Sequence, residues 1–392
     1  MNRAFHAAPS LLVLAAVACQ DRSVAPTAAR PSFAAAAPAG CPATPTVTVS
    51  DEAGLRNAIA TAAPGAVIAI QGMIGLTQDD SIFTAGLTIT CATPGSGLFA
   101  VAGAGVQDLL AVGARNVTID HLALDASQAG DSPVGAFNDG TTFFAESVRI
   151  TNNTGTCAPG GECVFVSGGL GAVITDNAFQ APGSFSGIQL QVDVERVDGA
   201  RIERNTLVAT APSIGLRQGG IRPADAADVV IADNTVIGPW RNGLSAARLA
   251  RSQVQGNEFR SAVRNGIRLS DAGPLFIAGV PASDNVFTNN RITASGEAGI
   301  FAQLACRNTF IGNTLQGNAG NIGLVFPDSS GANVFAGNAT IVVDNGAFDC
   351  NGDGVNDPNV ISGPGMARHG LQLGAAVSTT DAQRTVHGLL VR

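Results

Sequence analysis

Residues 171–207 read GAVITDNAFQAPGSFSGIQLQVDVERVDGARIERNTL, and this stretch contains the repeated unit that decides the fold. Its first phrase is an apolar residue, two variable residues and an asparagine, as in ITDN at Asn177 and IERN at Asn205. The phrase returns between residues 150 and 345 at Asn153, Asn177, Asn205, Asn234, Asn257, Asn290, Asn313 and Asn338. Self-similarity at steps of 23 to 33 residues is typical of a solenoid.

A second phrase follows each asparagine after nine or ten residues and is centred on a glycine. The glycines are Gly187, Gly215, Gly243, Gly266, Gly299 and Gly323, each followed by Ile or Leu. Apolar residues alternate with a period of two, which is typical of strands. Glycine suits a corner that needs a positive φ or a close backbone approach. The sequence therefore predicts coils of short strands, with two strands and two corners recognisable in each coil and a third connection of variable length.

This pattern resembles the right-handed parallel β-helix of the pectate-lyase-like superfamily. The resemblance implies an all-β, single-domain solenoid with its regular repeats over residues 116–360. It also implies that the asparagines form an internal ladder, in which each side chain bonds to the next coil and satisfies a buried corner. Because one fold hosts many functions, the resemblance predicts little about activity.

The two ends of the solenoid are predicted to be capped. Ser50 and Asp51 precede a helical pattern that places Leu55, Ala58, Ile59 and Ala62 on one face. We therefore expect residues 47–115 to form an N-terminal capping helix and the first coils. Residues 361–392 lose the repeated phrase and are predicted to be the C-terminal cap.

The first residues predict export. Residues 1–19 have a charged start, a short apolar segment and the ending AVAC, which resembles a bacterial lipobox. Lipidation at Cys19 would make the protein an outer-membrane or cell-surface lipoprotein, whereas ordinary signal cleavage would make it a secreted protein. Residues 20–46, rich in Ala and Pro, are predicted to be a disordered tether. A membrane contact is expected only through the lipid anchor.

Six cysteines remain after Cys19, an even number that predicts disulfides in an exported protein. The sequence does not fix their connectivity. Pairing of neighbours is the simplest arrangement, and it joins Cys41 to Cys91, Cys157 to Cys163 and Cys306 to Cys350.

The composition excludes some classes of function. The 392 residues have a net charge of −8, and the basic side chains are all arginine. General nucleic-acid or anionic-membrane binding is therefore not expected. Chemistry that depends on a lysine is excluded.

Arginines gather at equivalent positions of consecutive coils. Arg217, Arg241, Arg264 and Arg268 lie two residues before or after corner glycines, which predicts that they share one face. At one coil Gly220 competes with Gly215 as the corner and would present Arg222 instead. The arginines could grip an acidic glycan.

Other interpretations of this region stay open. Glu297 and Asp271 could pair with Arg264 and Arg268 as an ordinary surface network, or take part in substrate binding. Trp240, the single tryptophan, is either a platform for a sugar ring or a packed aromatic.

The segment FDCNGDGVNDPN near residue 350 predicts a calcium loop. It resembles the calcium loops of dockerins and thrombospondin type 3 repeats. Its ligands would be Asp349, Asn351, Asp353, the carbonyl of Val355, and Asp357. Val360 stands where such loops carry an acidic residue, which predicts weak binding or a plain turn, and the distance in sequence from the arginines predicts a structural role.

Two functions remain open from the sequence. The first is an exported protein that binds a polysaccharide or another envelope partner along a side face. The second is a polysaccharide lyase acting on uronate-containing glycans, with Arg264 or Arg268 as the base and Arg217 or Arg241 as the substrate clamp. Hydrolysis ranks lower, because the sequence shows no paired-aspartate motif.

Overall fold

The structure is a computed structural model of the whole chain. It describes residues 40–41, 44–192, 196–213, 219–270, 281–319, 322–326, 330–338, 341–344, 348–362 and 368–369. These residues belong to one compact unit, Ala35–Arg392. The predicted signal peptide with Cys19, most of the predicted tether and most of the predicted C-terminal cap lie outside the described residues.

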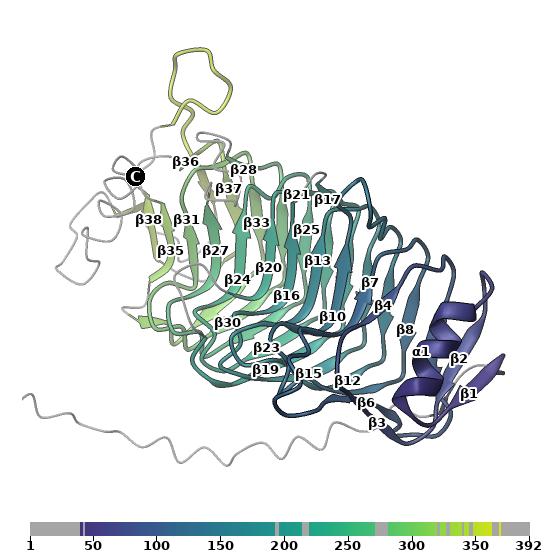
Figure 1. Cartoon of the computed structure of the whole chain (residues 1–392). Coiled ribbons are helices and arrows are strands. Elements are labelled where there is room, and N and C mark those ends of the chain that lie inside the picture. The colour runs from purple at the N-terminus through teal and green to yellow at the C-terminus, as the bar shows by residue number, and fades with distance from the viewer. Residues whose placement is uncertain are drawn as a thin grey trace, which may run out of the picture. The chain divides into compact units, whose positions relative to one another are not determined.

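Three long sheets of parallel strands wind together into a solenoid (Figure 1). Sheet A has 13 strands: β1 (Val47–Val49), β2 (Val67–Ile70), β5 (Thr88–Cys91), β8 (Thr118–Asp120), β11 (Arg149–Thr151), β14 (Val173–Thr175), β18 (Arg201–Glu203), β22 (Val230–Ala232), β25 (Gln253–Gln255), β29 (Val286–Thr288), β33 (Thr309–Ile311), β37 (Val334–Ala336) and β39 (Val360–Ser362).

Sheet B has ten strands: β3 (Met73–Leu76), β6 (Gly97–Ala100), β9 (Ala123–Asp125), β12 (Thr154–Thr156), β15 (Ala178–Pro182), β19 (Thr206–Ala211), β23 (Thr235–Ile237), β26 (Glu258–Arg260), β30 (Arg291–Thr293) and β34 (Thr314–Gln316).

Sheet C has 12 strands: β4 (Asp80–Ile82), β7 (Asp108–Val112), β10 (Ser132–Phe137), β13 (Glu162–Ser167), β16 (Ser186–Gln191), β20 (Gly219–Ala224), β24 (Asn242–Ala247), β27 (Asn265–Ser270), β31 (Ile300–Ala302), β35 (Ile322–Phe326), β38 (Ile341–Asp344) and β40 (Arg368–His369). Two small sheets lie between C and A: β17 (Val197–Asp198) with β21 (Ala226–Ala227), and β28 (Ala282–Ser283), β32 (Ala305–Cys306) and β36 (Ser330–Gly331).

Each regular coil runs from sheet A to sheet B to sheet C, and every pairing between strands of the long sheets is parallel. The predicted all-β parallel β-helix is confirmed. A coil has three strands rather than the two recognised in the sequence, because the phrase around each asparagine spans a strand of sheet A and a strand of sheet B. Inward side chains fill the core, including a stack of Phe287, Phe310 and Phe335 with ring centroids 4.8 and 4.7 Å apart.

The predicted asparagine ladder is present at the corner between sheets A and B. The side chain of Asn205 accepts from the backbone N–H and the side-chain amide of Asn177, and it donates to Asn234 Oδ1 at 2.9 Å. The residue before each rung turns the corner with a positive φ, 61° at Asp176 and 54° at Arg204. The ladder thus satisfies backbone groups that the turn leaves without strand partners.

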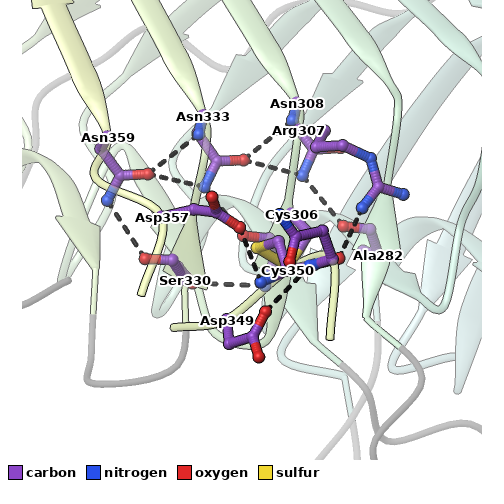
Figure 2. Close-up of a disulfide and its surroundings, with 12 residues drawn as sticks. Ala282, Cys306, Arg307, Asn308, Ser330, Asn333, Asp349, Cys350, Asp357 and Asn359 are labelled. Atoms are coloured by element: carbon purple, nitrogen blue, oxygen red, sulfur yellow. Dashed lines mark hydrogen bonds between the residues drawn. A yellow bond between two sulfur atoms is a disulfide. The ribbon is translucent and has the colours of Figure 1, made fainter. Parts of the chain in front are cut away.

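A second ladder, which the sequence interpretation missed, occupies the corner that leads into sheet A. It comprises Asn285, Asn308, Asn333 and Asn359, each bonded to the next as Figure 2 shows for the last three. Its signal was present in the sequence, because Asn285, Asn308 and Asn333 each lie five residues before a rung of the first ladder.

Helix α1 (Glu52–Thr61) covers the N-terminal end of the coils. Asp51 caps it by accepting from the Gly54 N–H at 2.7 Å. Leu55, Ala58 and Ile59 are buried against the first strands, so the predicted cap is confirmed.

All three predicted disulfides are confirmed, Cys41–Cys91, Cys157–Cys163 and Cys306–Cys350. The prediction that the glycines lie at corners is wrong, because Gly187, Gly243 and Gly266 lie inside strands β16, β24 and β27. Only one of the two reasons given for glycine applies. Gly187, Gly243 and Gly266 do not have positive φ; instead, a Cβ at Gly187 would lie 2.3 Å from the Gly220 carbonyl oxygen of the next coil. Close approach of the backbones is therefore what requires glycine.

Candidate functional site

On the outer face of sheet C one position repeats in each coil and forms a row, within which Gln189 and Ser245 are buried, at 3% and 6% exposure. Ile188, Ile221, Leu244 and Ile267 point into the core, so the residue after each of them points outward. The register places Gly135, Phe165, Gln189, Arg222, Ser245, Arg268 and Phe301 in this row. Arg222, the alternative at the uncertain coil, therefore takes the place first given to Arg217, which lies outside the described residues.

Three of the other predicted site residues stack on consecutive coils just before the strands of sheet C. The Arg264 N–H donates to the Arg241 carbonyl at 2.8 Å, and the Glu297 N–H donates to the Arg264 carbonyl at 2.7 Å. Arg264 pairs with Glu297, with 2.6 Å between Nε and Oε1, as the surface-network interpretation expected. Arg241, whose N–H donates to Ser213 Oγ, precedes the strand rather than lying in the row. Asp271 lies outside the described residues.

Trp240 is not available as a sugar platform. Its side chain is 1% exposed and belongs to the hydrophobic core. The interpretation as a platform is corrected for this reason, and the packed-aromatic alternative applies.

Four phenylalanines instead form an aromatic strip on the outer face of sheet C, near its N-terminal end. Ring centroids are 5.5 Å apart for Phe83 and Phe143, 5.8 Å for Phe143 and Phe137, and 5.7 Å for Phe137 and Phe165. These spacings and the tilted ring planes are typical of favourable aromatic contacts. Phe83 is 55% exposed and the other three are partly exposed, so the strip faces solvent.

Two glycines leave room for the rings of the strip, and a hydrogen-bonded loop positions Phe143. A Cβ at Gly113 would lie 2.5 Å from the Phe143 ring, and a Cβ at Gly135 would lie 2.6 Å from the Phe137 ring. Phe143 comes from the loop between β10 and β11, where Asp139 Oδ1 accepts the N–H groups of Thr141, Thr142 and Phe143. These bonds lower the pKa of Asp139 to about 2. The backbone at Gly113 and Gly135 and the hydrogen bonds at Asp139 therefore help to set the positions of the rings.

Two buried carboxyl groups, Asp108 at 5% and Glu162 at 7% exposure, lie where strands β7 and β13 of sheet C begin. Asp108 Oδ1 accepts from Ser132 Oγ at 2.5 Å, and the Asp108 carboxyl lies beside the outer surface of Gly135. Burial raises the pKa of Asp108 to about 7. Burial, with a hydrogen bond that protonated Glu162 donates to Asp131, raises the pKa of Glu162 to about 9. Near neutral pH Glu162 is therefore protonated and can donate a hydrogen bond.

Arg222 joins the carboxyl groups to the remainder of the row. Its Nη1 donates to Gln189 Oε1 at 2.6 Å, and its guanidinium lies 5.3 Å from the centroid of the Phe185 ring. Its positive charge also acts on Glu162 and opposes the rise of that pKa. This part of sheet C thus combines partly exposed aromatic rings, two buried carboxyl groups with raised pKa values and a guanidinium.

The predicted calcium loop is held to the solenoid by the Cys306–Cys350 disulfide (Figure 2). Asp349 Oδ1 accepts the N–H of Gly352 at 2.6 Å, and its Oδ2 accepts that of Gly354 at 2.7 Å. Asp357 Oδ2 accepts the N–H of Cys350. Within the described ranges, no group of three or more histidine, cysteine, aspartate or glutamate residues is arranged to hold a metal ion. Calcium binding by Asp349, Asn351, Asp353, Val355 and Asp357 stays a prediction.

Solved structures share the fold. The A-module of the Azotobacter vinelandii mannuronan C-5 epimerase AlgE4 matches with a TM-score of 0.52 and 14% identity, over 81% of this chain and 95% of that chain. The AlgE6 A-module of the same organism matches with a TM-score of 0.49 and 12% identity, over 82% and 94%. The Dettilon tailspike protein (gp208) matches at 0.47 and 17% identity, over 79% of this chain and 65% of the tailspike. Identities this low show the fold alone.

Among the described residues, no helix has the length and apolar character needed to cross a bilayer.

Sequence comparison defines the family. No curated protein matches the chain. The family model described as periplasmic copper-binding protein (NosD) matches residues 146–347, which is just over half of the 392 residues. The chain therefore belongs to the NosD family of periplasmic proteins.

Proposed function

We propose that this protein binds a polysaccharide along the outer face of sheet C, with the sugar rings lying on the aromatic strip. Family membership and the three disulfides indicate an exported protein, which meets such polymers outside the cytoplasm. The observation that carries the proposal is the strip of Phe83, Phe143, Phe137 and Phe165, and Arg222 follows this strip in the same row of sheet C.

The chemistry of the face favours an acidic glycan. Arg222 and Arg268 occupy equivalent positions two coils apart, which places them roughly 9.6 Å apart at ~4.8 Å per strand. Guanidinium groups bind carboxylates with paired hydrogen bonds. The raised pKa values of Asp108 and Glu162 keep much of the acidic edge uncharged near neutral pH, so this edge repels an anionic chain little.

The proposal is tested by isothermal titration of the exported domain with polygalacturonate, alginate and a neutral β-glucan. Phe137→Ala and Phe165→Ala are expected to weaken binding about two- to tenfold, because an aromatic contact contributes about 0.5–1.5 kcal/mol beyond the buried area. Phe99→Ala is the matched control, since Phe99 is 36% exposed but lies on sheet B. Equal losses in all three variants would show that the strip is not the binding surface.

A charge control separates the arginine from the rings. Arg268→Gln is expected to weaken binding of the two acidic polymers and to leave the β-glucan unchanged. Arg260→Gln, at an exposed position of sheet B, is expected to change neither.

A polysaccharide lyase is the alternative. β-Elimination requires a base that removes the proton next to the uronate carboxylate, after which the bond to the leaving oxygen breaks and a double bond forms. Arg268 lies on the face and stays a candidate base, whereas Arg264 is engaged with Glu297. A rise in ultraviolet absorbance during incubation with polygalacturonate or alginate, lost in Arg268→Ala, would favour the lyase over a binding protein.

Copper, which the family description names, does not fit the described residues. Proteins bind copper through imidazole, thiolate and thioether groups. The six described cysteines are paired in disulfides, and His121 lies beside Asp120, with 2.8 Å between Nδ1 and Oδ2. No group of metal-binding side chains assembles within the part of the chain that the structure describes. We therefore derive no step through copper.

Calcium is a separate proposal with a structural role. The loop from Asp349 to Asp357 carries oxygen-bearing side chains at the first, third, fifth and ninth positions, which suits a hard cation. Its attachment through Cys350 would let a bound ion stiffen the last described coils.

A further inference from the structure

The aromatic strip ends at a hollow beside the N-terminal cap. Residues of helix α1 form one wall and the segment 78–84 around strand β4 forms the other; the lining includes Arg56, Asp79, Asp80, Ser81 and Phe83. Strand β4 is the edge strand of sheet C, so the hollow lies at the end of the proposed binding face.

The strip and the hollow are continuous. Phe83 belongs to both, since its ring contacts Phe143 and also lines the hollow. Ser81 pairs with Ala111 in the outward row and is exposed. A polymer lying on Phe165, Phe137 and Phe143 would therefore extend along the row into the hollow.

A buried carboxyl group with an unused oxygen lies in the wall. Asp80 is 2% exposed, and its Oδ1 lies 3.2 Å from Arg56 Nε. Its Oδ2 has no hydrogen-bond partner among the described residues. A buried polar atom without a partner is costly unless a ligand or water satisfies it. Burial also raises the pKa of Asp80 to about 6.

The helix closes this end of the face. Helix α1 packs against β1, β2, β3 and β4, and its Arg56 lines the hollow, so the helix bounds the hollow at the end of sheet C where β4 is the edge strand. A carboxyl group beside a guanidinium is suited to the neighbouring hydroxyls of a sugar ring, and Phe83 offers a face for that ring.

We propose that the hollow binds the terminal sugar of the polysaccharide, so that the protein recognises chain ends rather than internal segments. This inference rests on the proposed binding function of the outer face of sheet C. The inference limits the number of protein molecules bound to one polymer, because one chain end can occupy only one hollow.

The experiment compares two preparations of polygalacturonate, one of short chains and one of long chains, at equal total sugar. Isothermal titration is expected to give a binding capacity in the ratio of the numbers of chain ends, and therefore higher for the short chains. Equal capacity per sugar would overturn end recognition while leaving lateral binding in place. A protein that binds neither preparation would overturn the proposed function as well.

Substitutions test whether this hollow is the site that recognises chain ends. Ser81→Trp would fill the hollow from an exposed position, and it is expected to abolish the dependence on chain ends. Phe83→Ala, at an exposed turn, is expected to reduce it. Thr314→Trp, at an exposed position of sheet B, is the control for an added indole and should preserve the dependence. End dependence that survives both Ser81→Trp and Phe83→Ala would contradict the assignment to this hollow.

Discussion

The first asparagine ladder allows a matched test of stability, because Asn290 belongs to the ladder and its chain neighbour Asn289 does not. Asn290 is fully buried, and its side chain makes four hydrogen bonds. Its Oδ1 accepts from the N–H and side-chain amide of Asn257, and its Nδ2 donates to the Val254 carbonyl and to Asn313. Asn289 precedes it on the exposed side of the corner, with φ at 54°.

Glycine substitution at each position separates ladder bonds from turn geometry. Asn290→Gly removes four bonds worth about 1 kcal/mol each and leaves buried groups without partners, so we expect a loss of about 4 kcal/mol in the free energy of unfolding. Asn289→Gly keeps a backbone conformation that glycine readily adopts, so we expect a change within about 0.5 kcal/mol.

Urea unfolding of both variants, followed by far-ultraviolet circular dichroism, measures the difference. A similar midpoint for Asn290→Gly and the parent protein would refute the reasoning, because it would mean that the ladder bonds contribute no net stability. A large loss in Asn289→Gly would show that the turn residue, rather than the ladder, stabilises the corner.

Three further predictions concern other parts of the solenoid. The pKa of Glu162 is about 9 in the folded protein, whereas it is near the ordinary value of 4.5 in the unfolded chain. The free energy of unfolding should therefore fall as the pH rises from 4.5 to 9. In Glu162→Gln the urea midpoint should depend less on pH over this range. Replacing both Cys306 and Cys350 with Ser should cost about 4 kcal/mol, because the bond closes a loop with a sequence separation of 44; an unchanged midpoint would contradict this. Millimolar Ca²⁺ should raise the melting temperature reversibly with a chelator, and Asp349→Asn should remove the effect; no shift in the parent protein would exclude the calcium loop.

The architecture could be predicted from the sequence because its determinants are periodic. Asn177 and Asn205 repeat in sequence as the ladder repeats in space, and the glycine phrase lies in or directly before five strands of sheet C: β16, β24, β27, β31 and β35. Neighbouring cysteines also paired as expected. The third strand of each coil was overlooked because the phrase around each asparagine contains two short strands joined by one tight corner.

The candidate site could not be predicted in the same way. Phe83, Phe137, Phe143 and Phe165 belong to no repeated phrase, and Phe143 comes from a loop. Only the register of stacked coils brings Asp108 and Glu162 to one edge. At the uncertain coil, the register selected Arg222. Trp240 was a candidate because of its residue type, but residue type alone did not reveal that it is buried.

The most direct test of the central claim is fluorine NMR of the protein labelled with 4-fluorophenylalanine, titrated with polygalacturonate. If the polymer lies on the outer face of sheet C, the resonances of Phe137, Phe143 and Phe165 will shift, while those of Phe99 and of the buried stack at Phe287, Phe310 and Phe335 will not. Shifts confined to Phe99, or binding that leaves all strip resonances unchanged, would contradict the account.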